Sequence, residues 1–313
     1  MSAPSVAQSV LQPASSQAAS LEWLWWFIFW MCTAVFVVVM GFLAAAVLRN
    51  KDRETPEPTL ERVVFAGAAG TVVLLFVWLI ASLAVGRVYA LPETSDAVTI
   101  NVTGRQWWWQ VEYVDSVPAK RFQTANELVI PVGRPVVVNL TSRDVVHSFW
   151  VPNLQGKRDL IPGYVSSIWF QADHEGMYRG QCAEFCGYQH AQMAMFVTAR
   201  KNDQFEQWLT AQRQPAIEPV SDAEQKGKNV FLSKTCVQCH AIRGTIAGAT
   251  LGPDLTHVGS RATIATGILP NTVDNLKRWV RNPQAIKPGN RMPPHDLSDE
   301  DLQALAEYLR SLK

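Results

Sequence analysis

The sequence predicts a multi-domain membrane protein with two transmembrane helices, then a β-sandwich or barrel, then a helical domain. Three observations predict this order. Two long uncharged stretches come first, many short β-rich segments separated by turn residues follow, and a cysteine–histidine motif between helical patterns comes last. The net charge is +1, so the composition does not indicate a nucleic-acid partner.

Two stretches, 23–48 and 63–86, contain no charged residue. Each exceeds the ~20 residues that an α-helix needs to cross a bilayer, so we expect a transmembrane helical hairpin over 21–91. The first stretch is not typical of a signal peptide, because residues 1–20 contain no Lys or Arg and the apolar run is too long. Residues 1–20 are rich in Ser, Ala and Gln, and we expect them to form a disordered external tail.

Basic residues predict the orientation of the hairpin. Arg49, Lys51, Arg53 and Arg62 lie in or beside the connection between the two stretches, and the N-terminal tail has no basic residue. Because basic loops stay in the cytoplasm, we expect the N-terminus and everything after the hairpin on the external side. In a bacterium this is the periplasmic face of the plasma (inner) membrane.

The middle region, which we place at 92–213, is predicted to be a β-sandwich or barrel. Its β-branched and aromatic residues occur in short runs, and pairs such as Pro162–Gly163 separate several of them. The strands are expected at 97–103, 107–114, 127–132, 135–140 and 165–170.

One short loop of this region carries a dense set of soft metal ligands: Cys182, Cys186, His190 and Met193. Thiolate, thioether and imidazole groups together suit copper. Two thiolates four residues apart can bridge two copper ions and share one electron between them. A second imidazole must come from elsewhere, and His147 is well placed. The alternatives are a disulfide between the two cysteines or a zinc site, although zinc would not call for the methionine.

A second motif follows a predicted linker at 214–220. Cys236-Val-Gln-Cys239-His240 is the attachment signature of a c-type haem, in which both thiols bind the haem and the histidine is an axial ligand. A thioredoxin-like redox pair is the alternative. Amphipathic helical patterns on both sides of the motif favour the haem.

The second axial ligand is predicted to be Met292. It is the only methionine after the haem motif, and a methionine ligand raises the reduction potential of the haem. His257 and His295 are the competing candidates.

At these motifs the chain resembles subunit II of haem–copper oxidases of the cytochrome c oxidase type over residues 21–200, and a class I cytochrome c over 221–313. The resemblance implies a cupredoxin-like sandwich with a binuclear CuA centre, and a cytochrome c-type donor. It implies that Glu184 ligates copper through its backbone carbonyl and that its side chain faces a magnesium site shared with subunit I. The implied copper ligands are His147, Cys182, Glu184, Cys186, His190 and Met193.

The same resemblance implies two further roles. Electrons would enter through the aromatic stretch Trp107, Trp108 and Trp109, although neighbours on a strand face opposite sides and at least one of them is expected to serve packing. Glu61 resembles an acid at the entrance of a proton channel, but Val64 stands where an aromatic residue is common, and a solvated interfacial glutamate is the alternative.

The combined architecture resembles subunit II of a bacterial caa-type cytochrome c oxidase. We therefore expect electrons to pass from an external donor to haem c, then to CuA and to subunit I, where O2 is reduced to water with proton translocation. The expected partners are subunit I, subunit III, and a cytochrome c or a quinol–cytochrome c reductase complex as donor. The alternatives are a subunit of a CuA-type nitric oxide reductase and a standalone membrane-anchored electron carrier.

Overall fold

The computed structural model of the chain describes residues 6, 8–49, 57–92 and 96–313. They divide into two compact units: Gln17–Ala90 form one, and the described residues up to Ser16 and from Leu91 onward form the other. Each unit is described by itself.

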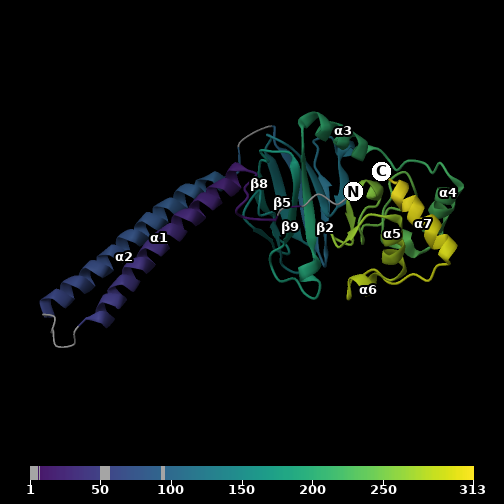
Figure 1. Cartoon of the computed structure of the whole chain (residues 1–313). Helices are drawn as coiled ribbons and strands as arrows, with labels where there is room; N and C mark the ends of the chain where they lie inside the picture. Colours follow the sequence, from purple (N-terminus) through teal and green to yellow (C-terminus); the bar gives the residue numbers. More distant parts are fainter. Residues whose placement is uncertain (1–5, 7, 50–56, 93–95) are drawn as a thin grey trace. The chain divides into compact units, whose positions relative to one another are not determined.

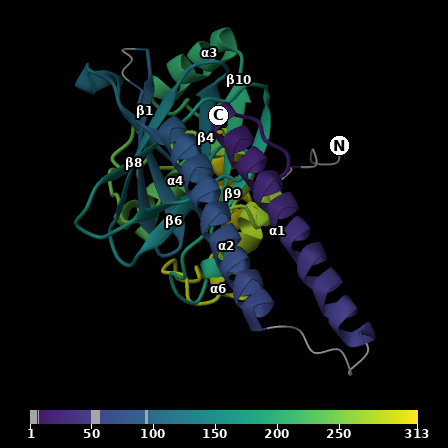
Figure 2. The ribbon, with the colours of Figure 1, turned by 90° about the vertical axis from the view of Figure 1, so that its left-hand side faces the viewer.

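Two long helices make up the first unit: α1 (Ser16–Leu48) and α2 (Glu57–Gly86), which run in opposite directions (Figures 1 and 2). Both are long and apolar enough to cross a membrane, and their apolar windows are not buried within the described chain. The expected spans 23–48 and 63–86 lie inside these helices. A short 3₁₀ turn, η1 (Arg87–Tyr89), follows α2.

The N-terminal segment differs from the disordered tail expected over residues 1–20. Residues 16–20 belong to α1, and the residues before them pack on the β-sandwich. Ala14 donates its N–H to Asn153 O (2.7 Å) and accepts from Asp173 N (2.8 Å). The prediction of disorder from composition was wrong for this segment, because its contacts use main-chain groups that every sequence has. Residues 1–5 and 7 lie outside the described residues.

The second unit begins with a sandwich of two five-stranded sheets (Figure 1). The strands are β1 (Val98–Arg105), β2 (Trp108–Tyr113), β3 (Phe122–Ala125), β4 (Glu127–Pro131), β5 (Val136–Ser142), β6 (His147–Trp150), β7 (Arg158–Leu160), β8 (Ser166–Phe170), β9 (Gly176–Cys182) and β10 (Ala194–Arg200). One sheet has the order β3-β2-β1-β5-β8 and the other β4-β10-β9-β6-β7. The pairs β1–β5 and β4–β10 are parallel, and the remaining pairs are antiparallel.

Alternating side chains build the core between the two sheets. Along β5 every second residue is buried, as expected for a strand with one face on the core. The core cluster includes Trp109, Phe149 and Phe170, and it also includes Cys182, Cys186 and Met193. The candidate copper ligands therefore lie at the edge of the hydrophobic core and not on a free loop.

The helical domain follows helix α3 (Asn202–Arg213) and has its own core. Helix α4 (Asp222–Ser233) begins with a capping box in which Ser221 and Glu224 bond each other's backbone N–H. Helix α4 and helix α7 (Asp299–Ser311) cross closely, since a Cβ on Gly227 would lie 2.1 Å from Ala304 O. The other helices and strands of this domain are β11 (Thr263–Ile264), β12 (Leu269–Pro270), α5 (Val273–Arg281) and α6 (Pro283–Ile286).

Candidate metal centres

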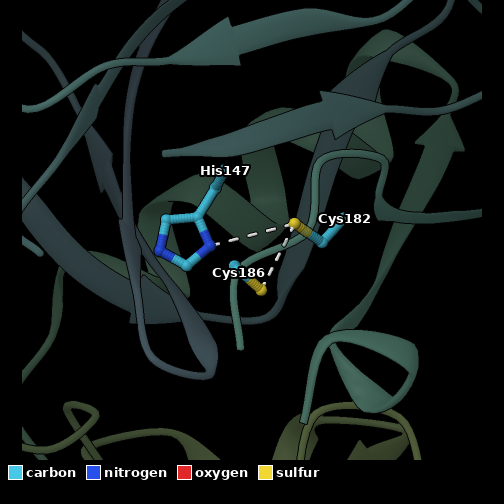
Figure 3. A group of neighbouring side chains, drawn as sticks. All are labelled: His147, Cys182 and Cys186. Atoms are coloured by element: carbon cyan, nitrogen blue, oxygen red, sulfur yellow. Dashed lines mark hydrogen bonds between the residues drawn. The ribbon is translucent and has the colours of Figure 1, made fainter. Parts of the chain in front are cut away.

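Three buried side chains from separate parts of the sandwich form the centre of the candidate copper site (Figure 3). Cys182 ends β9, Cys186 lies in the loop after it, and His147 opens β6, which pairs with β9. The two sulfur atoms are 3.7 Å apart, and His147 Nδ1 lies 3.8 Å from Cys182 Sγ. All three donor atoms lie within 4.8 Å of one another, close enough for shared metal ligation.

The other predicted copper ligands surround the same two sulfur atoms. His190 Nδ1 lies 3.6 Å and Met193 Sδ 3.9 Å from Cys186 Sγ. Glu184 O accepts a hydrogen bond from Cys182 Sγ at 3.2 Å. The structure thus brings all six predicted groups together, and both cysteines are free thiols. This donor set of two sulfurs, two imidazoles, a thioether and a carbonyl matches the preferences of copper.

Asp144 orients His147 and was missed by the sequence analysis. Its Oδ1 lies 2.8 Å from His147 Nε2, which leaves Nδ1 facing the sulfur. Carboxylates often hold metal-binding histidines in this way, so an acid three residues before the histidine was an available signal. Gly104 makes room for the ring, because a Cβ there would lie 2.7 Å from His147 Cδ2.

Hydrogen bonds set the protonation of this cluster. The bond with the Cys186 thiol lowers the pKa of Cys182 most, and His147 and two backbone groups lower it further. The bond with Cys182 in turn raises the pKa of Cys186, as does burial. Burial lowers the pKa of His147, but the bonds with Asp144 and Cys182 outweigh it, and the net shift is upward. One thiolate is therefore ready for a metal, and a metal would displace the second thiol proton.

The three tryptophans have different positions. Trp107 donates its indole N–H to Cys186 O at 2.9 Å. It therefore directly contacts the loop from Cys182 to Met193, which we call the candidate copper loop. Trp108 lies at the start of β2, and the Arg105 guanidinium stands 5.5 Å from its ring centroid. Trp109 is fully buried and packs edge-on against Phe149. Packing thus accounts for Trp109, and Trp107 is the member of the stretch that lies at the site.

In the haem motif, Cys236 lies on the 3₁₀ turn η4 (Thr235–Gln238), and Cys239 and His240 follow it. Both cysteines are free and partly buried. His240 Nδ1 lies 2.8 Å from Pro253 O, so this nitrogen can donate while Nε2 is left as the ligand atom. Burial lowers the pKa of His240, which favours the neutral imidazole that binds iron.

Met292 is partly buried and packs, like Cys236, against the core of the helical domain. Its N–H donates to Asn290 Oδ1 at 2.8 Å. The competing residue His257 is buried, and its two ring nitrogens lie 3.0 Å from Lys313 O and 3.0 Å from Gln214 O. Both nitrogens of His257 are thus engaged, which favours Met292 as the second axial ligand.

Two acids with predicted roles lie on exposed positions. The carboxylate of Glu184 is 3.8 Å from Lys157 Nζ, and its side chain is 45% exposed. This leaves the carboxylate accessible while the carbonyl faces the sulfurs. Glu61 is exposed in the first turns of α2.

Two family models match this chain. Residues 116–200 match the cytochrome c oxidase subunit II periplasmic domain, and residues 224–313 match cytochrome c. The first domain implies a CuA centre, and the second implies a haem. The donor sets described above suit these groups.

Three curated relatives are each named cytochrome c oxidase subunit 2. The protein of Alkalihalophilus pseudofirmus is 42% identical over 71% of this chain and 64% of its own length. That of Bacillus sp. (strain PS3) is 35% identical over 70% and 63%, and that of Bacillus subtilis is 33% identical over 71% and 64%. The chain thus spans just under two thirds of the length of these relatives.

The fold and the two sites define a membrane-anchored protein in which a cupredoxin-like domain precedes a cytochrome c domain. The matches confirm the resemblance expected from the sequence: the chain contains a cytochrome c oxidase subunit II periplasmic domain followed by a cytochrome c domain, and it is similar to proteins named cytochrome c oxidase subunit 2.

Proposed function

We propose that this chain is the subunit through which electrons enter a respiratory terminal oxidase. It receives electrons from an external donor at haem c, passes them to CuA, and delivers them to subunit I for reduction of O2 to water with proton translocation. The names of the relatives favour an oxidase over a nitric oxide reductase.

The observation that carries this proposal is the convergence of six predicted ligands on two sulfur atoms 3.7 Å apart. A binuclear copper centre bound by these residues would supply one-electron transfer. The polypeptide holds the ligands in place, because β6 and β9 fix His147 and Cys182, and Asp144 fixes the histidine ring. Preset ligands limit the rearrangement that accompanies each electron transfer.

In the cytochrome c domain, Cys236 and Cys239 would attach the haem covalently, and His240 and Met292 would be its axial ligands. The hydrogen bond to Pro253 O orients the histidine, and the bond to Asn290 orients the backbone of the methionine. The tether between the domains keeps the haem at a high local concentration near the copper loop, so transfer between them is intramolecular.

The remaining assignments belong to the assembled complex. Glu184 would share a magnesium ion with subunit I, Trp107 would be the group of the aromatic stretch that faces the electron path, and Glu61 would open a proton channel. Subunit III, a cytochrome c or quinol–cytochrome c reductase donor, and a bacterial inner membrane with both external domains on the periplasmic side complete the proposal.

The test is electron paramagnetic resonance (EPR) of the full chain, purified in detergent and oxidised. We expect the multi-line signal of one electron shared by two copper ions, beside low-spin ferric haem. Cys186→Ser should remove the multi-line signal and leave the haem signal. An ordinary single-copper signal in the wild type would contradict the proposal for the copper site, and consumption of nitric oxide instead of O2 by the native complex would contradict the oxidase.

A further inference from the structure

A buried lysine lies where the helical domain meets the candidate copper loop. Lys287, which follows α6, is 2% exposed. Its Nζ donates to Trp107 O (2.7 Å) and Gln192 O (2.9 Å), both on the sandwich, and to Thr266 Oγ1 (2.9 Å) in its own domain. Two of these three hydrogen bonds cross from the helical domain to the sandwich.

The arrangement suits an ammonium group. A lysine ammonium has three N–H donors and no acceptor, and here it meets three oxygen acceptors. None of the three belongs to a carboxylate. A buried charge is costly unless all its hydrogen bonds are made, so a lysine that only filled space would be a poor choice here. The bonds across the domain boundary indicate that Lys287 has a structural role.

The residues after Lys287 continue the contact. Gln189 Nε2 donates to Pro288 O at 2.6 Å. Gly289 has φ +79°, and a Cβ on it would lie 3.4 Å from the ring of Tyr188. Tyr188 and Gln189 both belong to the loop between Cys182 and Met193. The segment 287–289 therefore lies directly on the candidate copper loop.

Hydrogen bonds extend from this contact toward both metal sites. On the haem side, Asn290 Nδ2 donates to Lys287 O (2.6 Å), and Asn290 Oδ1 accepts from Met292 N (2.8 Å). On the copper side, the residue whose carbonyl Lys287 binds, Trp107, donates its indole N–H to Cys186 O. Lys287 thus lies between the segment of one candidate haem ligand and the backbone of one candidate copper ligand.

The turn between β11 and β12 supports the same point of contact. Ala265 and Thr266 have φ +52° and +61°, a left-handed conformation that is costly for residues other than glycine. Thr266 Oγ1 also lies 3.1 Å from Trp107 O. At Gly267 a Cβ would be 2.9 Å from the Phe196 ring of β10. This unfavourable backbone is held at the place where Thr266 reaches the interface.

Other contacts between the domains lie outside this cluster. The Glu127 carboxylate accepts from Ala262 N (3.2 Å), Thr263 N (2.9 Å) and Thr263 Oγ1 (3.1 Å). These bonds should keep the helical domain attached to the sandwich when Lys287 is replaced. Loss of Lys287 should then affect the local alignment of the helical domain on the candidate copper loop.

We propose that Lys287 is a positioning residue that fixes the cytochrome domain on the copper loop, and that this docked arrangement is the one from which the haem passes electrons to copper. The proposal rests on the proposed function for the identity of the two centres. The contact itself joins groups of the polypeptide, so amide exchange measures it separately from electron transfer.

The docked arrangement has a consequence for the external donor. Trp107 O and the side chain of Gln189 are occupied by the chain's own cytochrome domain. A separate donor protein therefore meets the cytochrome domain, and the surface around Trp107 serves internal transfer.

The experiment compares the full-length wild-type chain, as purified with its cofactors, with Lys287→Met by hydrogen–deuterium exchange. Loss of hydrogen bonds from a charged buried group should lower amide protection by about ten-fold or more in segments 187–193 and 287–290. The central strands of the sandwich and helix α7 should keep their protection. The matched control is Lys277→Met, since Lys277 donates to Gln303 of the same domain; it should leave both segments unchanged.

A second variant covers the case in which Lys287→Met unfolds the domain. Gln189→Ala removes the bond to Pro288 from the opposite side without leaving the lysine unpaired, and it should loosen the same two segments. If neither variant changes protection at these segments, or if Gln189→Ala loosens only its own loop, the docking role of Lys287 is wrong.

With cofactors present, flash photoreduction of the haem should show slower electron transfer to copper in Lys287→Met, by about the ten-fold loss of docking. The EPR signals and reduction potentials of both centres should not change. An unchanged transfer rate beside intact signals would overturn the positioning role alone. Absent copper or haem signals in the wild type would instead contradict the proposed function.

Discussion

The candidate copper site and the candidate haem site differ in how far the polypeptide alone completes them. At the copper site, Cys182 and Cys186 are buried and the donor atoms of three residues lie within 4.8 Å. At the haem site, Cys236 and Met292 are only partly buried at the margin of their core. The sandwich thus prepares its metal site with strands, whereas the helical domain is expected to use the haem as part of its core.

The largest effect is expected when the attachment of the haem is removed. In a chain with Cys236→Ala and Cys239→Ala, we expect no haem absorbance to remain with the denatured polypeptide. The unfolding temperature of the helical domain should also fall, because a ligand that binds the folded state stabilises it. The multi-line copper signal should persist, since the sandwich does not depend on the haem.

The control for this experiment is Cys32→Ser, which changes a cysteine in α1 and should retain the haem. Covalent haem in the double alanine variant would show that attachment does not use this motif. Loss of the copper signal in the same variant would show that the two sites depend on each other more than their separate cores indicate.

A smaller effect is expected from Asp144→Asn. The substitution removes the negative charge that lies 2.8 Å from His147 Nε2 and keeps the shape of the side chain. Changes to groups that hold metal-binding histidines typically cost about 10–100-fold in metal affinity, and a competition titration with copper would measure this loss. Asp203→Asn, at an exposed position on α3, is the matched control. Equal affinities in the two variants would mean that strands alone hold the histidine.

The sequence pointed to the candidate metal ligands more directly than to the contacts around them. The loop from Cys182 to Met193 carries most of the candidate copper ligands within one short motif, and this spacing predicts the site. Strands β3, β6, β7, β9 and β10 were not predicted. Strands β3, β6 and β7 are short, and β9 contains Gly176 and Gly180, residues that are depleted in strands.

The docking contacts could not be predicted, for a physical reason. Lys287 binds two main-chain carbonyls of a different domain, and any residue has such a carbonyl. No motif or periodicity in the sequence marks them. The N-terminal segment, which bonds the backbone of Asn153, was mispredicted as disordered for the same reason.

A pH dependence is also expected at the contact between the domains. Burial lowers the pKa of Lys287 from its ordinary 10.5 to about 7. Below about pH 7 the lysine is charged in both the folded and the unfolded chain. Between about pH 7 and 10.5 the unfolded chain binds more protons, so the contribution of Lys287 to stability rises with pH, by at most about 1.4 kcal/mol per pH unit.

Thermal unfolding of wild type and Lys287→Met across this range would measure the effect as a difference. Groups that titrate equally in both variants cancel, provided that they are not coupled to Lys287. We expect the stability of the wild type relative to the variant to increase from pH 7 to 10. A difference that stayed constant would mean that the three acceptors keep the ammonium charged at every pH tested. The hydrogen bonds of Lys287 would then outweigh the effect of burial on its pKa. The contact between the domains would hold a constant charge, just as the copper site holds its donor atoms in place before a metal binds.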